Sequence, residues 1–428
     1  MSEIQHQTPD YEHAYKSACW IRGVDYRAVE TGKVYQTSNQ SIRPHCYTEI
    51  TIYNTLTSKS TNTPHGTQAL PVSPPPSLPK NAQLTQPPSS TGATGYIGGS
   101  VLATLVTAHP DWTFTALLRR APPSFSTVYP SVRILHGDYD SVSTLAAAAQ
   151  DADIVVHCGD SDHEASLNAL LAGLKRRSTP GYLVHLSGTG IVADWAEEEF
   201  QGRLNPKVWS DVDKEDVEAI RNLPEERLHR NTEKMLHQTI RDDGDKVKVA
   251  VMCPPDIYGK GKGPGKTSSA MVPMFVREAM KRGHVFHINE GANARSWVHI
   301  DDLMRVYTKV VEVAASGDAD TVQQYFGENG YHFAGTQEHS HMQLARKVGE
   351  VLAQRAVIAS PEPVEIGLEE VDKIVYWPQF PALARYLYAS NSRTSADRAK
   401  ELWGYEGRAE GLLEGVKGDV LAALEASG

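Results

Sequence analysis

The fold is decided by the stretch Thr91-Gly92-Ala93-Thr94-Gly95-Tyr96-Ile97-Gly98-Gly99-Ser100, which the apolar run Val101–Val106 follows. Its glycines at 92, 95 and 98 have the spacing G-x-x-G-x-x-G. A glycine-rich turn that opens a helix lets backbone N–H groups approach a pyrophosphate, and the N-terminus of the helix stabilises the negative charge. The stretch therefore predicts a dinucleotide-binding loop. A glycine-rich turn without a ligand is the weaker alternative, because a well-patterned helix follows.

The size and charge of the chain limit the classes of function. Its 428 residues are enough for one large domain or two to three smaller ones, and its apolar fraction of 40% is that of a globular protein. The net charge of −10 argues against nucleic-acid binding, since phosphate contacts need clustered lysine and arginine side chains. No apolar run approaches the roughly 20 residues of a membrane span, so no membrane partner is expected.

The cysteine pattern and the first residues indicate a cytoplasmic protein. The four cysteines, at positions 19, 46, 158 and 253, lie far apart and form no C-x-x-C pair. This spacing disfavours a disulfide framework and a zinc site, and it fits a reducing compartment. Residues 1–6 lack the basic and apolar regions of a secretory signal. The histidines at 332, 339 and 341 do not have the spacing of a metal site, so no metal is expected.

Residues 1–88 differ in composition from the rest of the chain. Ten of the 25 prolines fall here, and serine, threonine, glutamine and asparagine fill much of the remainder. Such a segment buries too little apolar surface to offset its ordering entropy. This predicts a disordered extension, with a polyproline-like linker at 71–90. Residues 47–53 alternate like a strand, but a transient extended segment is favoured there.

The residues before the glycine loop do not have the pattern of a strand. A dinucleotide-binding loop normally follows a buried apolar strand, whereas Gln86-Pro87-Pro88-Ser89-Ser90 stands here. Two interpretations remain open. The extension is genuine, or it is an artefact of gene prediction that displaced the first strand.

From Thr91 onward, predicted strands and helices alternate. Strands are predicted at 113–118, 132–135, 153–158, 182–186 and 247–252, and helices at 97–107, 141–150, 161–177 and 224–240. Continuous apolar strands that alternate with helices imply a parallel sheet covered on both faces. Further along, helices are predicted at 270–282, 301–314 and 342–356, a strand near 285–288, and mostly helix over 361–428.

Two motifs resemble those of the extended short-chain dehydrogenase/reductase superfamily, in its epimerase/dehydratase branch. The glycine loop, with Thr94, Tyr96 and Ile97 among its glycines, resembles the cofactor loop, and Arg295–Leu303 resembles the segment Arg-x-Phe-Val-His-Val-x-Asp-Leu. Cys253–Gly261 more weakly resembles Arg-Pro-x-x-Val-Tyr-Gly-Pro-Gly.

This resemblance covers residues 89–428 and implies an α/β fold. A Rossmann-type, doubly wound parallel sheet is expected to bind NAD(P) at 89–255. A smaller C-terminal substrate lobe is expected at 256–428, with Rossmann elements returning at about 295–335.

The resemblance also implies cofactor contacts beyond the glycine loop. Arg119 and Arg120 end the second strand, where NAD enzymes usually carry an acid, so NADP is favoured over NAD. A solvated basic pair is the alternative. Asp138 matches a Gly-Asp pair that places a carboxylate near the adenine amino group in the family, and an Asx-type turn cap is equally supported.

The catalytic residues of the family are a Ser or Thr after the fifth strand and a Tyr-x-x-x-Lys motif. Thr189, with Ser187 as second choice, matches the residue that binds the reacting oxygen. Lys234 matches the Lys, which holds the nicotinamide ribose, but the Tyr position carries Arg230. A guanidinium cannot exchange a proton near neutrality. His229, which titrates in a useful range, or a residue of the substrate lobe is the substitute acid, although a one-residue offset turns a helical side chain by about 100°.

Arg230, Arg295 and Tyr258 are the candidate substrate contacts. Arg295 matches the position that contacts substrate phosphate in sugar-nucleotide members of the family, while Arg230 binds an anionic group or lies on the surface. Residues 259–267 predict a mobile substrate-side loop rather than a Walker loop, whose spacing requires glycine at Lys260. The expected partner is a small, anionic substrate.

The implied reaction is hydride transfer between NAD(P) and a C–OH/C=O pair of a small carbonyl or sugar-type substrate. The alternative is an NAD(P)-binding regulator or sensor with impaired turnover, like the NmrA-like relatives of the superfamily, and the missing tyrosine supports it. Family members often dimerise through two helices, which here are those at 161–177 and 224–240.

Overall fold

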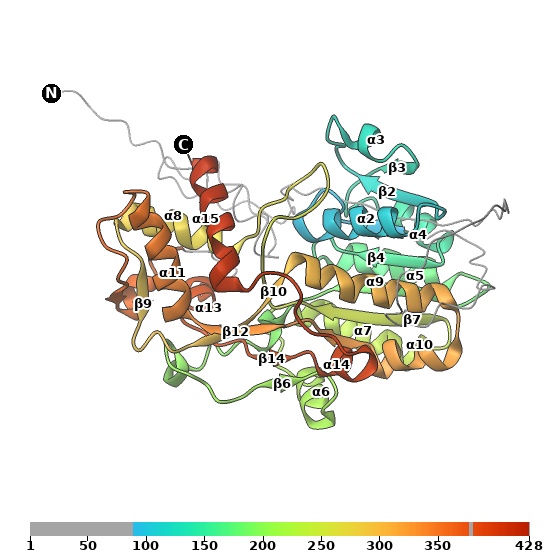
Figure 1. Cartoon of the computed structure of the whole chain (residues 1–428). Coiled ribbons are helices and arrows are strands. Elements are labelled where there is room, and N and C mark those ends of the chain that lie inside the picture. Colours follow the sequence, from blue (N-terminus) through green and yellow to red (C-terminus); the bar gives the residue numbers. More distant parts are fainter. Residues whose placement is uncertain (1–88, 376–379, 428) are drawn as a thin grey trace, which may run out of the picture.

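A parallel sheet of seven strands forms the centre of the first lobe (Figure 1). The computed structural model describes residues 89–375 and 380–427. In sheet order the strands are β3 (Val132–His136), β2 (Phe114–Leu118), β1 (Ser89–Thr91), β4 (Ile154–His157), β5 (Gly181–Leu186), β7 (Val247–Cys253) and β11 (Tyr331–Phe333). All neighbouring pairs are parallel. The chain order reverses between β1 and β4, as in a doubly wound sheet, which confirms the predicted fold class.

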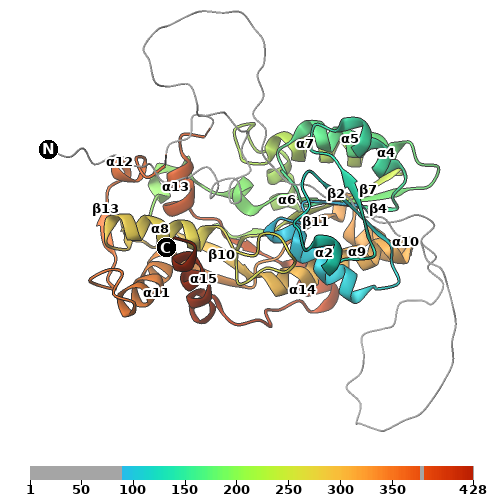
Figure 2. The same cartoon turned by 90° about the horizontal axis from the view of Figure 1, so that it is seen from above.

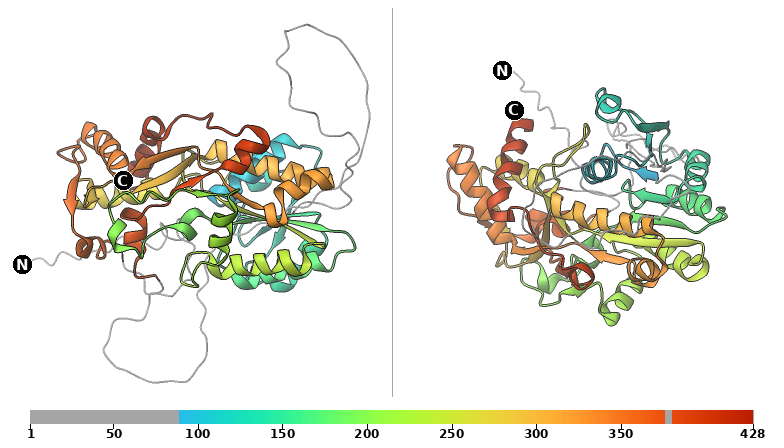
Figure 3. Two further views of the ribbon diagram at one scale, coloured as in Figure 1. Left: turned by 90° about the horizontal axis from the view of Figure 1, so that it is seen from below. Right: turned by 45° about the vertical axis from the view of Figure 1, so that its right-hand side comes forward.

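Helices cover both faces of this sheet (Figure 2, Figure 3). One layer contains α4 (Val142–Gln150), α5 (Glu164–Lys175) and α7 (Arg230–Asp243), and the other contains α2 (Tyr96–Ala108), α9 (Ile300–Ser316) and α10 (Ala319–Tyr325). Every residue of β2 and β4 is buried, as coverage on both faces requires. Short elements complete the lobe: α3 (Phe125–Val128), η1 (Thr189–Val192), η2 (Glu198–Phe200), β6 (Trp209–Ser210), α6 (Lys214–Arg221), η3 (Gly327–Asn329), β14 (Thr394–Ser395) and α14 (Asp397–Trp403).

A second lobe with its own apolar core packs beside the first (Figure 1). Its helices are α8 (Met271–Arg282), α11 (His341–Gln354), α12 (Leu368–Val371), α13 (Leu383–Tyr388) and α15 (Leu412–Ser427). Its strands are β8 (Asp256–Tyr258), β9 (Phe286–Ile288), β10 (Ala294–His299), β12 (Gln337–Ser340) and β13 (Val364–Ile366). None of the helices in the described part of the chain has both the length and the apolar character needed to cross a bilayer.

The first strand is short and polar, yet it occupies the centre of the sheet. Residues 89–91 pair in parallel with β2 on one side and β4 on the other. The expectation that no strand precedes the glycine loop, and the linker assigned to residues 89–90, are therefore wrong. Backbone hydrogen bonds from both neighbours hold a strand that its own side chains do not specify. The other predictions for residues 1–88 lie outside the described residues.

The other predicted strands and helices between 97 and 356 are present, with ends shifted by three residues or fewer, except at α7. The predicted start at Pro224 is wrong, because α7 begins at Arg230. His229 before it has a left-handed backbone with φ of 65°, which ends the preceding turn and prevents one continuous helix. His229 therefore lies at the N-cap, outside the helix.

Two histidines are buried side by side in the sheet. His157 on β4 and His185 on β5 are register partners, and their ring centroids lie 4.9 Å apart. Burial lowers the pKa of His157 to about 3 and holds the pKa of His185 well below its ordinary value. Neither ring nitrogen of His185 has a hydrogen-bond partner among the described residues. Both rings are therefore neutral in the folded protein.

We expect the neutral His185 ring to make the fold sensitive to acid. Below pH 6.5 the unfolded chain protonates this histidine and the folded chain does not, so stability falls as the pH falls, by up to about 1.4 kcal/mol per pH unit for each such group. His185→Leu should reduce the pH slope of the unfolding free energy between pH 6.5 and 4.5 in urea titrations. His136→Leu, at an exposed position on β3, should leave the slope unchanged. Equal slopes in the wild type and His185→Leu would contradict this account.

Candidate functional site

The glycine loop folds tightly against the end of β4. Gly92 has φ of 93°, and a Cβ there would lie 2.2 Å from the carbonyl oxygen of Cys158. A Cβ on Gly98 would lie 2.4 Å from the Gly92 oxygen, so only glycine fits both positions. Gly95 caps α2 without a side-chain hydrogen bond. The first N–H groups of this helix therefore remain available to an anion, and the loop fits the pyrophosphate of a dinucleotide.

A cavity of about 150 Å³ opens beside the loop, between the two lobes. On the first lobe its walls are Tyr96 and Ile97 of the glycine loop, Ser187–Gly190 after β5, and His229. On the other side they are Pro254–Ile257 after β7 and side chains of α8 and α13. The carboxyl ends of the central strands therefore meet the second lobe here, at the edge where doubly wound sheets bind their ligands.

His229 is the buried histidine of this cavity, with 6% of its surface exposed. Its Nδ1 lies 3.0 Å from Oδ1 of Asp162 and 3.2 Å from Oγ of Ser161. Its Nε2 faces the cavity wall at Gly188, where a Cβ would lie 3.1 Å from it. A carboxylate at Nδ1 holds the proton on that nitrogen and orients the ring, which leaves Nε2 to exchange a proton.

The carboxylates around His229 raise the pKa of its ring. Burial lowers the pKa of His229, but the carboxylates of Asp162, Glu233 and Asp160 outweigh burial and raise the pKa above its ordinary value. Its left-handed backbone costs of order 1–3 kcal/mol, and such strain is concentrated at functional sites. The ring is thus held in one place with a pKa suited to acid–base work.

Glu233 lies four residues after His229 and is fully buried. It accepts hydrogen bonds from Oγ of Ser187 and from the hydroxyl of Tyr331, the latter at 3.0 Å, and Sγ of Cys253 lies 3.8 Å away. Burial raises the pKa of Glu233 to about 6. Glu233 therefore ties α7 to the ends of three strands and orients the Ser187 hydroxyl.

His229 lines the cavity and Glu233 is buried against Ser187, whereas Arg230 and Lys234 do not line the cavity. Arg230 donates from Nε to the Leu223 oxygen at 2.8 Å. Lys234 is exposed and pairs with Glu225, so its role at the nicotinamide ribose stays a prediction that its placement does not favour. Sequence comparison missed Glu233. The available signal was its spacing of four from His229, which places two residues on one side of a helix.

The other residues predicted to bind the reacting oxygen or the substrate have hydrogen-bond or ion-pair partners within the protein. Thr189 lines the cavity, and its Oγ1 accepts a hydrogen bond from Ser392 at 3.0 Å. Arg295 is buried, pairs with Asp256, and donates to the Tyr386 oxygen at 3.1 Å and to Oγ of Ser390 at 3.0 Å. The Tyr258 hydroxyl donates to the Glu410 oxygen at 2.6 Å. Arg295 and Tyr258 therefore stabilise the second lobe in this structure.

The residues predicted to contact the adenosine part of the cofactor follow β2 and β3. Arg119 and Arg120 are exposed after β2. Oδ1 of Asp138 accepts a hydrogen bond from Oγ of Ser141 at 2.8 Å, which is the turn-cap arrangement. Burial raises the pKa of the Cys158 thiol to about 12, so this thiol is not a nucleophile. Among the described residues, no group of three or more His, Cys, Asp or Glu could hold a metal ion.

Comparison with known families and proteins agrees with this architecture. Residues 92–220 match the NAD(P)H-binding family, and residues 229–323 match the NAD dependent epimerase/dehydratase family. The oxidase ucsJ of Acremonium sp is 30% identical over 326 residues, which cover 74% of this chain and 91% of ucsJ. The uncharacterized protein YLL056C of Saccharomyces cerevisiae is 25% identical over 329 residues, which cover 76% of this chain and 96% of that protein.

Solved structures share the fold at lower identity. DesIV, a dTDP-glucose 4,6-dehydratase from Streptomyces venezuelae solved with NAD and TYD bound, matches with a TM-score of 0.51 and 16% identity, over 78% of this chain and 95% of DesIV. UDP-glucose 4-epimerase from Thermotoga maritima, solved with UDP-glucose, matches with a TM-score of 0.51 and 17% identity, over 79% and 98% of the two chains.

The contact between Asp162 and His229 gives a prediction that needs no substrate. In Asp162→Asn the ring stays buried but loses the carboxylate that most strongly raises its pKa, so the pKa of His229 should fall. NMR titration of the ring measures this fall. The His229 signal is identified as the one that is missing from the spectrum of His229→Asn. Asp140→Asn, beside His163 at 3.6 Å, should leave the His229 titration unchanged. An unshifted pKa in Asp162→Asn would refute the pairing.

Proposed function

The chain belongs to the extended short-chain dehydrogenase/reductase superfamily, and from this premise we propose that it transfers hydride between NADP and the C–OH/C=O group of a small substrate. The observation that carries the proposal is His229, a buried titratable ring held by Asp162 with Nε2 turned to the cavity. It supplies the proton exchange for which the family uses the missing tyrosine.

In this proposal the glycine loop and the first turn of α2 hold the pyrophosphate of the dinucleotide. The bound dinucleotide supplies the hydride donor or acceptor. Nε2 of His229 takes the hydroxyl proton of an alcohol substrate, or returns a proton to the oxygen of a carbonyl substrate. Asp162 stabilises the imidazolium that forms when the ring takes the proton. Ser187, whose hydroxyl donates to Glu233, is held in place as part of the cavity wall.

The cavity favours a small substrate with an apolar part. Ala270, Met271, Met274 and Leu387 line its second-lobe side, together with Tyr386. Asp256, a charged residue on this side, is an acid that pairs with Arg295, so this side supplies shape and exclusion of water rather than an anion site. We propose a small alcohol or carbonyl compound in preference to a sugar nucleotide. The proposed homodimer through α5 and α7 is independent of this choice.

We propose NADP as the preferred dinucleotide because two exposed arginines follow β2, at the position where an acid would bind the ribose 2′-hydroxyl of NAD. The double variant Arg119→Ala/Arg120→Ala should lose about tenfold or more in affinity for NADPH, which corresponds to about 1.4 kcal/mol, and little for NADH. Quenching of tryptophan fluorescence measures both affinities. The double variant Arg346→Ala/Arg355→Ala, at two exposed arginines of the second lobe, is the charge-matched control. Equal losses for the two cofactors would contradict the preference.

His229→Asn tests the proposed reaction without disturbing the backbone, because asparagine tolerates a left-handed backbone and caps helices. Turnover of NADPH or NADP with a panel of aldehydes, ketones and alcohols should fall about 10²- to 10⁴-fold, the usual contribution of a general acid–base group. The affinity for NADPH should change by less than about threefold, as the ring does not hold the pyrophosphate. If the wild type binds NADPH and turns over no member of the panel, the NmrA-like regulator becomes the better account. Unchanged turnover in His229→Asn would place the proton donor elsewhere.

A further inference from the structure

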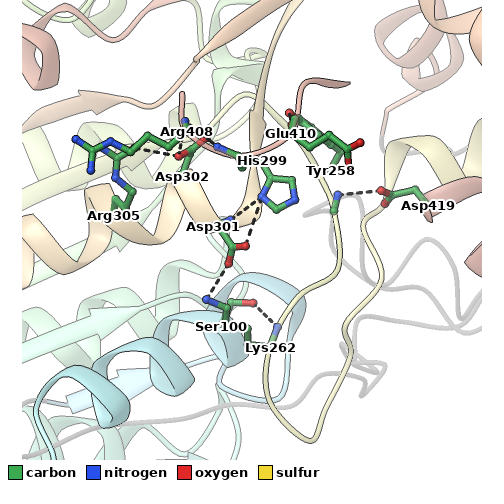
Figure 4. Close-up of polar contacts among 12 residues, drawn as sticks. Ser100, Tyr258, Lys262, His299, Asp301, Asp302, Arg305, Arg408, Glu410 and Asp419 are labelled. Carbon is green, nitrogen blue, oxygen red and sulfur yellow. Dashed lines mark hydrogen bonds and ion pairs between the residues drawn. The ribbon is translucent and has the colours of Figure 1, made fainter. Parts of the chain in front are cut away.

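The segment Gly259–Lys266, Gly-Lys-Gly-Lys-Gly-Pro-Gly-Lys, leaves the second lobe and lies against the glycine loop and α2 (Figure 4). A Cβ on Gly261 would lie 2.7 Å from the ring of Tyr96, and one on Gly265 would lie 2.2 Å from the Thr94 oxygen. Alternate glycines are thus the points at which the segment touches its neighbour. Side chains at these points would push it away from the glycine loop.

Both ends of this loop are fixed by one carboxylate of the second lobe. Oδ2 of Asp419, on α15, accepts a hydrogen bond from the backbone N–H of Gly259 at 2.9 Å. Oδ1 of the same residue accepts one from Oγ of Ser269. Asp419 is buried, with 6% of its surface exposed. Residues 259–269 therefore form an Ω-loop with a firm base in the second lobe.

The tip is held on the first lobe by weaker contacts. At the tip, the N–H of Lys262 donates to Oγ of Ser100 at 2.9 Å, while the Tyr96 hydroxyl donates to the Gly259 oxygen at the base at 2.7 Å. Nζ of Lys262 pairs with Asp301 at 2.8 Å, but both side chains are about half exposed (Figure 4). Exposed ion pairs contribute little to stability. The ion pair at the tip is thus weaker than the buried contacts of Asp419 at the base.

Lys266 lies where the tip meets the glycine loop. Its N–H donates to the Thr94 oxygen at 2.8 Å. Its half-buried ammonium has no acidic partner among the described residues, and burial together with Arg277 lowers its pKa to about 8. A second cation beside a half-buried ammonium is unfavourable unless an anion joins them. The N-terminus of α2, which has no side-chain cap, follows Thr94 directly in the glycine loop and is suited to bind an anion such as a pyrophosphate.

We propose that residues 259–269 form a clamp that closes over the bound dinucleotide, with Lys266 contacting its pyrophosphate. The clamp requires that the chain binds a dinucleotide, as in the proposed function, but it does not require turnover. The dinucleotide enters and leaves only when the tip is lifted. Once the tip is down, the Lys266 ammonium and the N–H groups of the glycine loop bind the pyrophosphate together.

Lys266→Met tests the phosphate contact by binding alone. This variant should bind NADPH about tenfold or more weakly, while 2′-AMP, which has no pyrophosphate, should bind equally well to wild type and variant. Lys260→Met, on the same segment and exposed, should bind both ligands like the wild type. Unchanged NADPH affinity in Lys266→Met would overturn the contact, and an equal loss for 2′-AMP would overturn its assignment to the pyrophosphate.

Gly265→Ala tests closure, because its Cβ meets the Thr94 carbonyl. NADPH should dissociate from it at least tenfold faster in stopped-flow fluorescence. Gly367→Ala, where nothing lies within 4 Å of the added Cβ, should dissociate like the wild type. In the wild-type protein, NADPH should slow amide hydrogen exchange across residues 259–269, a result that needs no variant to fold. Unchanged exchange, or equal dissociation rates, would overturn the clamp.

These outcomes separate the clamp from the reaction. Slower exchange in 259–269 and weaker NADPH binding by Lys266→Met, without turnover by the wild type, would support the clamp and refute the oxidoreductase. Turnover by the wild type, together with unchanged NADPH binding by Lys266→Met, would support the oxidoreductase and refute the clamp. A wild type that binds no dinucleotide would refute both.

Discussion

The rest of the site depends on one close approach, that of the Gly92 backbone to the carbonyl oxygen of Cys158. No side chain fits between them, so the end of β1 and the end of β4 meet in direct backbone contact. That contact fixes the direction in which α2 leaves the sheet, and with it the orientation of the uncapped first turn. It also leaves room between the sheet edge and the second lobe, where His229 and the chain after β7 line the cavity.

Much of the fold could be predicted because its signals are local. Apolar runs over β2, β4, β5 and β7 are buried on both faces and can be found without knowing their neighbours. The first strand could not be found this way. Its three residues, Ser-Ser-Thr, carry no apolar pattern, and the strand exists because two neighbours pair with its backbone. The start of α7 was missed for a related reason, since the left-handed backbone of His229 leaves no mark in a pattern of residue types.

The site was less predictable than the fold, because its chemistry comes from residues distant in sequence. His229 was identified as a candidate, but Asp162, which orients it, lies 67 residues away. Glu233 acquires its role from Ser187 and Tyr331, which belong to different strands. Arg295 illustrates the opposite case. Its motif matches that of a phosphate-binding arginine, yet a carboxylate of the neighbouring strand takes up its charge in this structure.

The Ω-loop pinned at Asp419 has a kinetic consequence for the order in which ligands meet the protein. Its tip covers the glycine loop, while the cavity beside His229 lies past its base. A dinucleotide has to arrive before the tip descends, and a smaller partner reaches the cavity afterwards. The proposed clamp therefore implies a compulsory order of addition, in which the dinucleotide binds first and leaves last. When the smaller partner is scarce, a protein with such a clamp would keep its dinucleotide bound between encounters.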